Sequence, residues 1–310
     1  MNDKPARHWS RYVKLASFAV IIIGVPLLFI PLDNYYQPRS LGQAWNFGHV
    51  VLFACATIML SSRWRWLRAR SFELQVAILA LLSLLVGYGI ELVQLHTGGD
   101  YSLQDVCLDI SGACLAAAVY PGGRRPWMKY SPLFLRLAVI AYLLFRAYPL
   151  ALDLVDEYRA RAQFPVLADF TSSLQLDRFG GGAGLKITAG GMQVSFGTTK
   201  YSGFSLKYFP RDWRGYAHVR IELNNPGPDE IDLTCRIHDE LHNQSYDDRF
   251  NRRFAIQPGA QAIMISLAEV ENSPRTRKMD LGRIGGLGCF TVSRAIPAQL
   301  VISSIALSRH

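Results

Sequence analysis

The stretch GYGIELVQLHTGGDYSLQDVCLDISG, residues 87–112, joins the end of one strongly apolar segment to the start of the next. It places Glu91, Gln94, Asp105 and Asp109 within or beside sequence that is apolar enough to lie in a lipid bilayer. Ionisable side chains are costly at membrane depth, so by default they mark a functional site. The stretch therefore indicates a membrane protein with a polar site between two of its helices.

Apolar segments fill the first half of the chain, and a spanning helix needs about 20 mostly apolar residues. The first and third segments have this length, the second and fourth are shorter, and the fifth contains Arg136 and Arg146, which can extend to the headgroups. We predict an α-helical membrane domain over residues 1–152 with about five spans, at residues 15–32, 47–62, 74–95, 103–120 and 132–152.

The formal charge is +9, and much of it falls in short loops beside the apolar segments, which favours a membrane-topology role over nucleic-acid binding. Basic residues alternate between loops. They gather before the first segment, after the second and after the fourth: Lys4, Arg7, Arg11, Lys14, Arg63, Arg65, Arg68, Arg70, Arg124, Arg125 and Lys129. The positive-inside rule then puts the N-terminus in the cytoplasm, and five spans put the second half outside.

With this orientation the polar residues share the outer end of the bundle. His49 opens the second segment, Glu91 and Gln94 close the third, and Asp105 and Asp109 open the fourth. Each pair has a helical spacing of three or four, so its members share a face. Such a group could perform acid–base chemistry or hold a polar headgroup or a cation. Alternatively, the side chains join helices and cap them, as Ser102 with Asp105 suggests.

At these positions the chain resembles the VanZ-like membrane proteins. The resemblance covers residues 45–120 and rests on NFGHVVLFA with His49, GYGIELVQ with Glu91 and Gln94, and SLQDVCLDISGA with Asp105. It implies a bacterial cytoplasmic-membrane protein linked to the cell envelope. Two positions depart from the family: Asp100 replaces its usual Arg, and Asp109 replaces a frequent Asn. The site here is therefore more acidic than the resemblance implies.

From residue 164 the pattern changes to short runs of period two, such as LKITA, MQVSF and IDLTCRI, bounded by Gly, Pro, Asn or Asp. This pattern predicts an all-β sandwich or jelly roll. We expect residues 153–163 to be a linker and residues 164–310 to form an extracytoplasmic domain that is long enough to bury its own core.

The polar and aromatic run at residues 238–253 is the candidate ligand site of this half. Planar polar groups suit sugar hydroxyls and rings suit the apolar faces of sugars; the candidates are Asp239, His242, Asn243, Tyr246, Asp248 and Arg249. The run resembles carbohydrate-binding jelly rolls of the galactose-binding-like type, over residues 164–308. The alternative is that Asp248, Arg249 and Asn251 form an ion-pair and turn network that only stabilises the sandwich.

The cysteines show no metal-binding spacing, and we expect no metal and no cofactor. Cys55, Cys107 and Cys114 lie in apolar segments and are most simply buried side chains. Cys235 and Cys289 lie in separate strands of the second half. They could form a disulfide in an oxidising compartment, or both could be unpaired core residues.

Three functions fit these features. The first is an envelope protein that presents a carbohydrate-binding sandwich on the outer face of the cytoplasmic membrane, near lipids and a surface polysaccharide, glycolipid or peptidoglycan precursor. The second is a membrane enzyme that modifies a lipid-linked or surface polysaccharide, with Glu91 or Asp105 as acid or base and His49 as its partner; no recognised catalytic motif supports it. The third and weakest is an ion-coupled carrier, because the acidic groups lie near one end.

Overall fold

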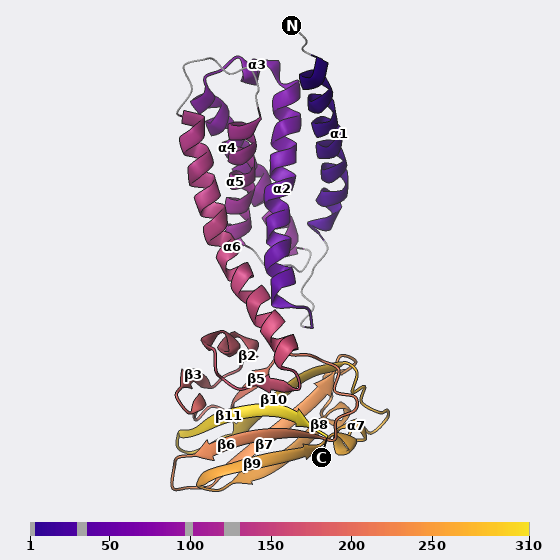
Figure 1. Cartoon of the computed structure of the whole chain (residues 1–310), viewed down its shortest axis with the longest axis vertical. Coiled ribbons are helices and arrows are strands. Elements are labelled where there is room, and N and C mark those ends of the chain that lie inside the picture. The colour runs from indigo at the N-terminus through magenta and orange to yellow at the C-terminus, as the bar shows by residue number, and fades with distance from the viewer. Residues whose placement is uncertain (1–3, 30–35, 97–101, 121–130, 310) are drawn as a thin grey trace. The chain divides into compact units, whose positions relative to one another are not determined.

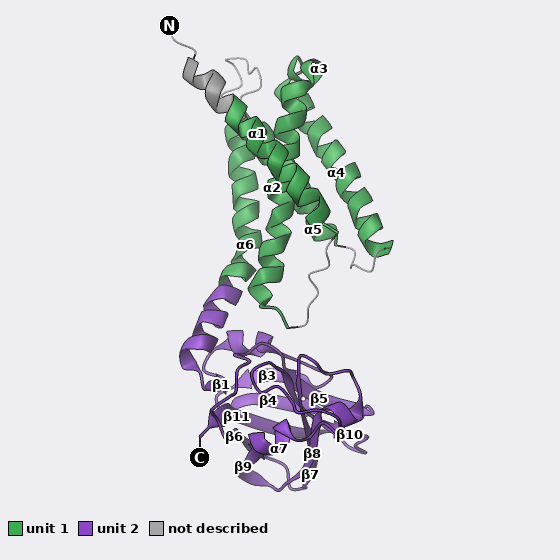
Figure 2. Cartoon of the chain, turned by 90° about the vertical axis from the view of Figure 1, so that its right-hand side faces the viewer, with its two compact units in different colours: residues 1–151 green, residues 152–310 purple. Residues whose placement is uncertain are grey.

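The computed structural model describes residues 4–29, 36–96, 102–120 and 131–309 (Figure 1). The chain divides into two compact units, a helical one over residues 1–151 and one over residues 152–310 that contains all the strands (Figure 2). One helix, α6 (Ser131–Gln163), begins in the first unit and ends in the second.

The first unit is made of helices with many exposed apolar side chains. Besides α6 it contains α1 (Lys4–Leu27), α2 (Arg39–Arg63), the short α3 (Arg65–Arg68), α4 (Phe72–His96) and α5 (Leu103–Val119). By length and composition, three helical stretches within the described residues can cross a membrane: Arg39–Arg63, Phe72–His96 and Leu133–Gln163. A count of about five spans stays a prediction.

The helix ends differ from the predicted spans. The helix α2 begins at Arg39 instead of residue 47, so His49 lies almost three turns inside it and does not open it. The helix α1 ends at Leu27, before the predicted limit of residue 32. The expected linker at residues 153–163 is helical, because α6 continues to Gln163. Hydropathy marks the apolar part of a helix, whereas backbone hydrogen bonds continue into its polar ends.

The centre of the bundle is α5, which packs against both α2 and α4. Its buried face is rich in small residues, which let neighbouring helices approach closely. A Cβ added at Gly112 would clash with the carbonyl oxygen of Val50, and one at Gly87 would clash with the carboxylate of Asp109. Gly89, in contrast, faces open space. Gly112 and Gly87 are therefore needed for the helix contacts, and Gly89 is not.

Both arginines of α6 that lie in the apolar sequence bind α5. Arg136 Nε donates to the carbonyl oxygen of Ala118 at 2.8 Å, and Arg146 Nη2 donates to Gln104 Oε1 at 2.5 Å. These hydrogen bonds satisfy part of each guanidinium.

The last turns of α6 belong to the second unit through one buried ion pair. Arg178 donates from Nε to Asp156 Oδ2 at 2.9 Å and from Nη2 to Asp156 Oδ1 at 2.8 Å, and both side chains are almost fully buried. Arg178 Nη1 also donates to the carbonyl oxygen of Leu167. The pair fixes the end of the helix against the first strand of the sandwich.

The second unit is an antiparallel β-sandwich, as its period-two pattern predicts. One sheet has the order β3-β4-β11-β6-β9, with β1 also paired to β11, and the other has the order β2-β5-β10-β7-β8. The strands are β1 (Val166–Ala168), β2 (Phe179–Gly180), β3 (Gly184–Thr188), β4 (Gly191–Phe196), β5 (Tyr201–Leu206), β6 (His218–Asn225), β7 (Ile231–Asp239), β8 (Phe250–Ile256), β9 (Gly259–Ser266), β10 (Ile284–Val292) and β11 (Ala298–Ser308). Three short helical turns connect them: η1 (Ser173–Arg178), η2 (Tyr246–Asp248) and α7 (Leu267–Glu271).

The core lies between the two sheets, and β7 shows how alternation builds it. Ile231, Leu233, Cys235 and Ile237 point inward and are buried. Directly opposite Cys235 on β10 is Cys289, and the two form a disulfide. The sequence left open whether these cysteines form a disulfide or stay unpaired in the core, and the structure has the disulfide.

We expect Gly112→Ala to destabilise the bundle and Gly89→Ala to leave it unchanged or slightly more stable. An added methyl at Gly112 forces α5 away from α2, at a cost of about 1–3 kcal/mol. At Gly89 the methyl has space, and Ala favours the helix by about 1 kcal/mol. Thermal unfolding of both full-length variants in detergent measures the difference. Equal melting temperatures would show that the α2–α5 contact is not close.

Candidate functional site

Three helices bring the polar residues of the bundle together. His49 comes from α2, Glu91 from α4 and Asp109 from α5, and all three are buried. His49 Nδ1 lies 2.9 Å from Asp109 Oδ1, so the imidazole and the carboxylate form a hydrogen-bonded pair across the α2–α5 contact. The sequence places the two residues 60 positions apart, and only the fold joins them.

The remaining polar residues of this cluster form hydrogen bonds with backbone groups where α4 ends and α5 begins. Ser102 Oγ accepts from the N–H of Asp105 at 3.3 Å and caps α5, as predicted. The N–H of Ser102 donates to Glu91 Oε2 at 2.6 Å, and this bond shows that α4 and α5 are antiparallel neighbours. Gln94 Nε2 donates to the carbonyl oxygen of Leu28 at 2.7 Å. Gln94 and one oxygen of Glu91 therefore act as helix contacts.

Three buried carboxylate oxygens have no hydrogen-bond partner among the described residues: Glu91 Oε1, Asp105 Oδ1 and Asp109 Oδ2. Buried polar atoms of native proteins are normally paired, so these oxygens can accept from an added donor such as a hydroxyl or ammonium group. Asp100, which replaces the family's Arg, lies outside the described residues. In the described part of the chain, no group of three or more His, Cys, Asp or Glu side chains is arranged to hold a metal ion.

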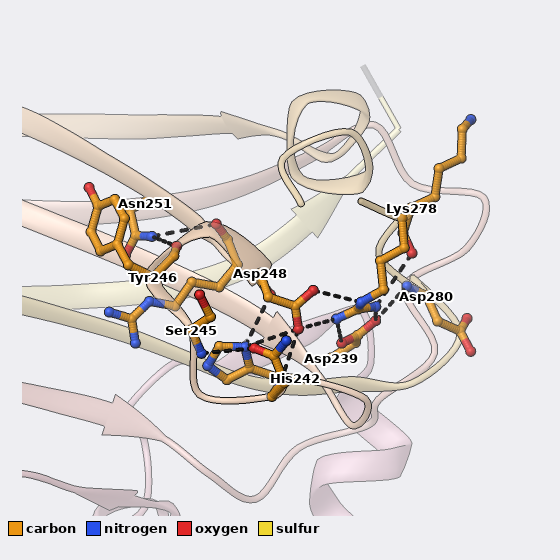
Figure 3. Close-up of polar contacts among 11 residues, drawn as sticks. Asp239, His242, Ser245, Tyr246, Asp248, Asn251, Lys278 and Asp280 are labelled. Carbon is orange, nitrogen blue, oxygen red and sulfur yellow. Dashed lines mark hydrogen bonds and ion pairs between the residues drawn. The ribbon is translucent and has the colours of Figure 1, made fainter. Parts of the chain in front are cut away.

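In the sandwich, the guanidinium of Arg277 binds the carboxylates of Asp239 and Asp248, two of the predicted ligand-site residues. It donates to the two oxygens of Asp239 at 2.5 and 2.7 Å and to those of Asp248 at 2.7 and 3.0 Å. Asp239 also accepts from the N–H of Asp280, and His242 Nδ1 lies 3.0 Å from the carbonyl oxygen of Asp248. Figure 3 shows the labelled Asp239 and Asp248 converging on this ion-pair network.

The pKa values of the two carboxyls reflect this contact. Hydrogen bonds from Arg277 lower the pKa of Asp248 to about 2. Burial alone would raise the pKa of Asp239, but hydrogen bonds from Arg277 and from the N–H of Asp280 outweigh it and hold that pKa below its usual range. Both carboxylates are therefore charged at neutral pH and are satisfied within the protein.

Three of the predicted residues of the 238–253 run remain available at the surface. Asn243 and Tyr246 are exposed, and Arg249 is half-buried with its guanidinium carbon 5.6 Å from the centre of the Tyr246 ring. Figure 3 shows Tyr246 beside Asn251, on the side of Asp248 that faces away from Asp239. The run is thus divided between an ion-pair network and an exposed part.

The exposed part continues across the outer face of the five-stranded sheet as a row of planar side chains. The ring of Phe290 on β10 has Tyr201 at 5.8 Å, edge to face, and the guanidinium carbon of Arg236 at 5.9 Å. The register Ile237↔Phe250 puts Arg249 beside His238 at the next position. We call this set the planar strip; it consists of Tyr201, Phe290, Arg236, His238, Arg249 and Tyr246.

Two glycines of β10 give the strip its shape. A Cβ at Gly286 would lie 2.9 Å from His238 Cε1, and one at Gly288 would lie 3.3 Å from Arg236 Nε. The imidazole and the guanidinium therefore lie over positions that have no side chain. Because the strip combines rings with forked donors, it can accept a flat, hydroxyl-rich ligand.

The family comparison concerns the helical unit. The model of the VanZ/LLP1 family matches residues 4–125. The match begins earlier and ends slightly later than residues 45–120, on which the resemblance rested. The buried cluster of His49, Glu91, Asp105 and Asp109 lies within this VanZ-like segment, whereas the sandwich lies outside it. No curated protein sequence is significantly similar to this chain.

The solved structures that resemble part of the chain include carbohydrate-binding modules and an agarase. A family 11 carbohydrate-binding module from Clostridium thermocellum has 20% identity and a TM-score of 0.38, over 46% of this chain and 94% of that one. The protein PfGH50B has 17% identity and a TM-score of 0.35, over 43% of this chain. An agarase has 16% identity and a TM-score of 0.39, over 47% of this chain. The matches span only 22% of PfGH50B and 26% of the agarase.

We expect Arg277→Met to destabilise the sandwich by about 3 kcal/mol, because it leaves two carboxylates without their cation. A fragment of residues 152–310 has Trp213 as its single, fully buried tryptophan, so fluorescence in urea reports its unfolding. The matched control is Arg253→Met, which breaks the exposed pair with Asp232 and should cost less than about 1 kcal/mol.

The same contact predicts an acid transition. An Asp in an unfolded chain has a pKa of about 3.9, whereas that of Asp248 in the fold is about 2. The stabilisation is therefore present above about pH 4 and is lost as the pH falls towards 2. Arg277→Met should flatten this part of the stability curve. An unchanged curve would show that the ion pair does not stabilise the loop.

Proposed function

We propose that this chain is a cell-envelope membrane protein whose β-sandwich binds a carbohydrate on the outer face of the bacterial cytoplasmic membrane. The planar strip is the observation that carries the proposal. Rings offer flat apolar surfaces for the C–H faces of sugars, and guanidinium groups offer parallel N–H donors for neighbouring oxygens. The strip combines both on the outer face of one sheet, where Tyr201 and Tyr246 are exposed and the other members are half-buried.

The strip also changes which predicted residues form the proposed ligand site. Tyr246 and Arg249 belong to it, and Asn243 lies exposed near its end. Asp239, His242 and Asp248 support the proposal indirectly, because they fix the loop that carries Tyr246 and Arg249. Arg236, His238, Tyr201 and Phe290 are the additional residues that we assign to sugar contact.

Two features support an extracytoplasmic sandwich. The disulfide between Cys235 and Cys289 suits an oxidising compartment. The alternating basic loops of the helical half favour a cytoplasmic N-terminus, and an odd number of spans then exports the sandwich.

Within the VanZ-like segment, we propose that the buried cluster holds a polar lipid headgroup or glycan group. The unpartnered oxygens of Glu91, Asp105 and Asp109 can accept hydrogen bonds from its hydroxyl or ammonium groups. Membrane lipids, glycolipids or a peptidoglycan precursor offer such groups.

The alternative is a membrane enzyme that modifies a lipid-linked or surface polysaccharide. The hydrogen-bonded pair of His49 and Asp109 favours it, because a carboxylate can orient an imidazole for proton transfer. Turnover of a lipid-linked oligosaccharide that is lost in Asp109→Asn but kept in the control Gly89→Ala, whose added methyl meets no neighbouring atom, would support this alternative. Absence of turnover in the unmodified protein would exclude it for that substrate.

We expect Tyr246→Ala and Tyr201→Ala each to weaken glycan binding about three- to tenfold, the effect of losing one ring contact. Binding of the purified full chain to a panel of immobilised polysaccharides measures this. The control is Tyr158→Ala, which removes an exposed ring on α6, outside the strip. Equal losses in all three variants, or no glycan binding by the unmodified chain, would contradict the proposal.

We expect an alkaline phosphatase fused after His310 to be active in intact bacteria, because this enzyme needs an oxidising compartment to form its disulfides. A fusion after Arg68 should be inactive, since that loop is basic and predicted to be cytoplasmic. The opposite pattern, or activity in both fusions, would contradict the proposed topology.

A further inference from the structure

The planar strip contains two neighbouring cations, and no carboxylate of the described residues pairs with either. Arg236 and Arg249 come from β7 and from the residue before β8, and Arg236 is close enough to lower the pKa of Arg249, although burial contributes more. Arg249 Nε is buried and has no hydrogen-bond partner among the described residues. In that part of the chain, neither arginine forms an ion pair within 4 Å.

Four nearby carboxylates already have arginine partners. Arg277 holds Asp239 and Asp248, Arg275 pairs with Asp247, and Arg253 pairs with Asp232 on the same sheet face. Arg253 on β8 thus has a carboxylate partner, whereas Arg236 and Arg249 have none among the described residues. Like charges held side by side are unfavourable unless an anion compensates them.

His238 adds to the unbalanced charge only under acidic conditions. Burial, together with nearby His242, Arg236 and Arg249, lowers the pKa of His238 to about 4. The imidazole is therefore neutral at pH 7, where it can donate or accept a hydrogen bond. At neutral pH the charge of the strip comes from the two guanidinium groups.

Aromatic rings beside the two guanidinium groups favour an anion that is attached to sugar rings. Phe290 and Tyr201 lie on one side of the guanidinium pair, and Tyr246 lies against Arg249 on the other. A lone phosphate would use the cations but leave the rings without contacts. A chain of sugar rings with an acidic group uses both, because a guanidinium binds a carboxylate or sulfate through parallel N–H bonds.

We infer that the planar strip binds an acidic polysaccharide, with a carboxylate or sulfate between Arg236 and Arg249 and neighbouring sugar rings on Phe290, Tyr201 and Tyr246. The inference rests on the proposed carbohydrate binding and specifies the ligand class of that site.

The test compares acidic and neutral glycans on the full chain in detergent. The probes are polygalacturonate, carrageenan and the neutral mixed-linkage β-glucan, immobilised for biolayer interferometry. We expect at least one acidic glycan to bind about tenfold more tightly than the neutral one, and this binding to weaken as salt rises. Arg236→Gln and Arg249→Gln should each reduce it about tenfold, whereas Arg253→Gln, an arginine already paired with Asp232, should not change it.

A charge-conserving variant separates ligand contact from folding. Arg249→Lys keeps the positive charge but loses the forked donor, so we expect a loss of only a few-fold with the salt dependence retained. Melting temperatures of all variants should match that of the unmodified chain.

Each other outcome overturns the inference. Neutral glycan binding that equals or exceeds acidic binding, and survives Arg236→Gln, would leave carbohydrate binding intact but exclude an acidic ligand. Binding of the detergent-free fragment of residues 152–310 to phosphatidylglycerol vesicles but not to phosphatidylcholine vesicles, lost in Arg236→Gln and without any glycan binding, would assign the strip to anionic lipid. Absence of binding to every glycan and vesicle would refute both the inference and the proposed function.

Discussion

The contact of Arg277 with Asp239 and Asp248 determines the character of the candidate sugar site. It joins the end of β7 to the η2 loop and fixes the segment that carries Tyr246 and Arg249. It also removes both nearby carboxylates from the surface chemistry. The outer face of the five-stranded sheet is left with rings and with two unbalanced guanidinium groups. One partly buried ion-pair network thus gives the loop its position and gives the outer sheet face its charge.

The polar cluster of the VanZ-like segment depends on close packing between helices. Because α5 is rich in small residues, α2 and α4 can approach it closely enough for His49 to reach Asp109 and for Glu91 to reach the N–H of Ser102. Larger residues at Gly87 or Gly112 would separate these groups. The polar cluster and the close packing of the helices are therefore the same structural feature.

The sequence predicts the helical first half and the β-sandwich, because these follow from local periodicity. It also predicts the cap at Ser102, because serine is a favoured residue at a helix start. It does not predict the ends of α2 and α6, where helices extend beyond their apolar parts. Nor does it reveal the partner of Asp239, since Arg277 lies 38 positions away. One available signal was missed. Asp239 is in phase with Ile231, Leu233, Cys235 and Ile237, so alternation directs it inward and directs Arg236 and His238 outward.

The central claim is that the outer face of the five-stranded sheet binds an acidic glycan. Amide chemical shifts of an isotope-labelled fragment of residues 152–310, titrated with oligogalacturonate, test it most directly. We predict shifts that centre on Arg236, Gly288 and Phe290 and extend to Tyr246, while amides of the six-stranded sheet stay unchanged. Shifts confined to the six-stranded sheet, or no shifts at saturating ligand, would contradict the account.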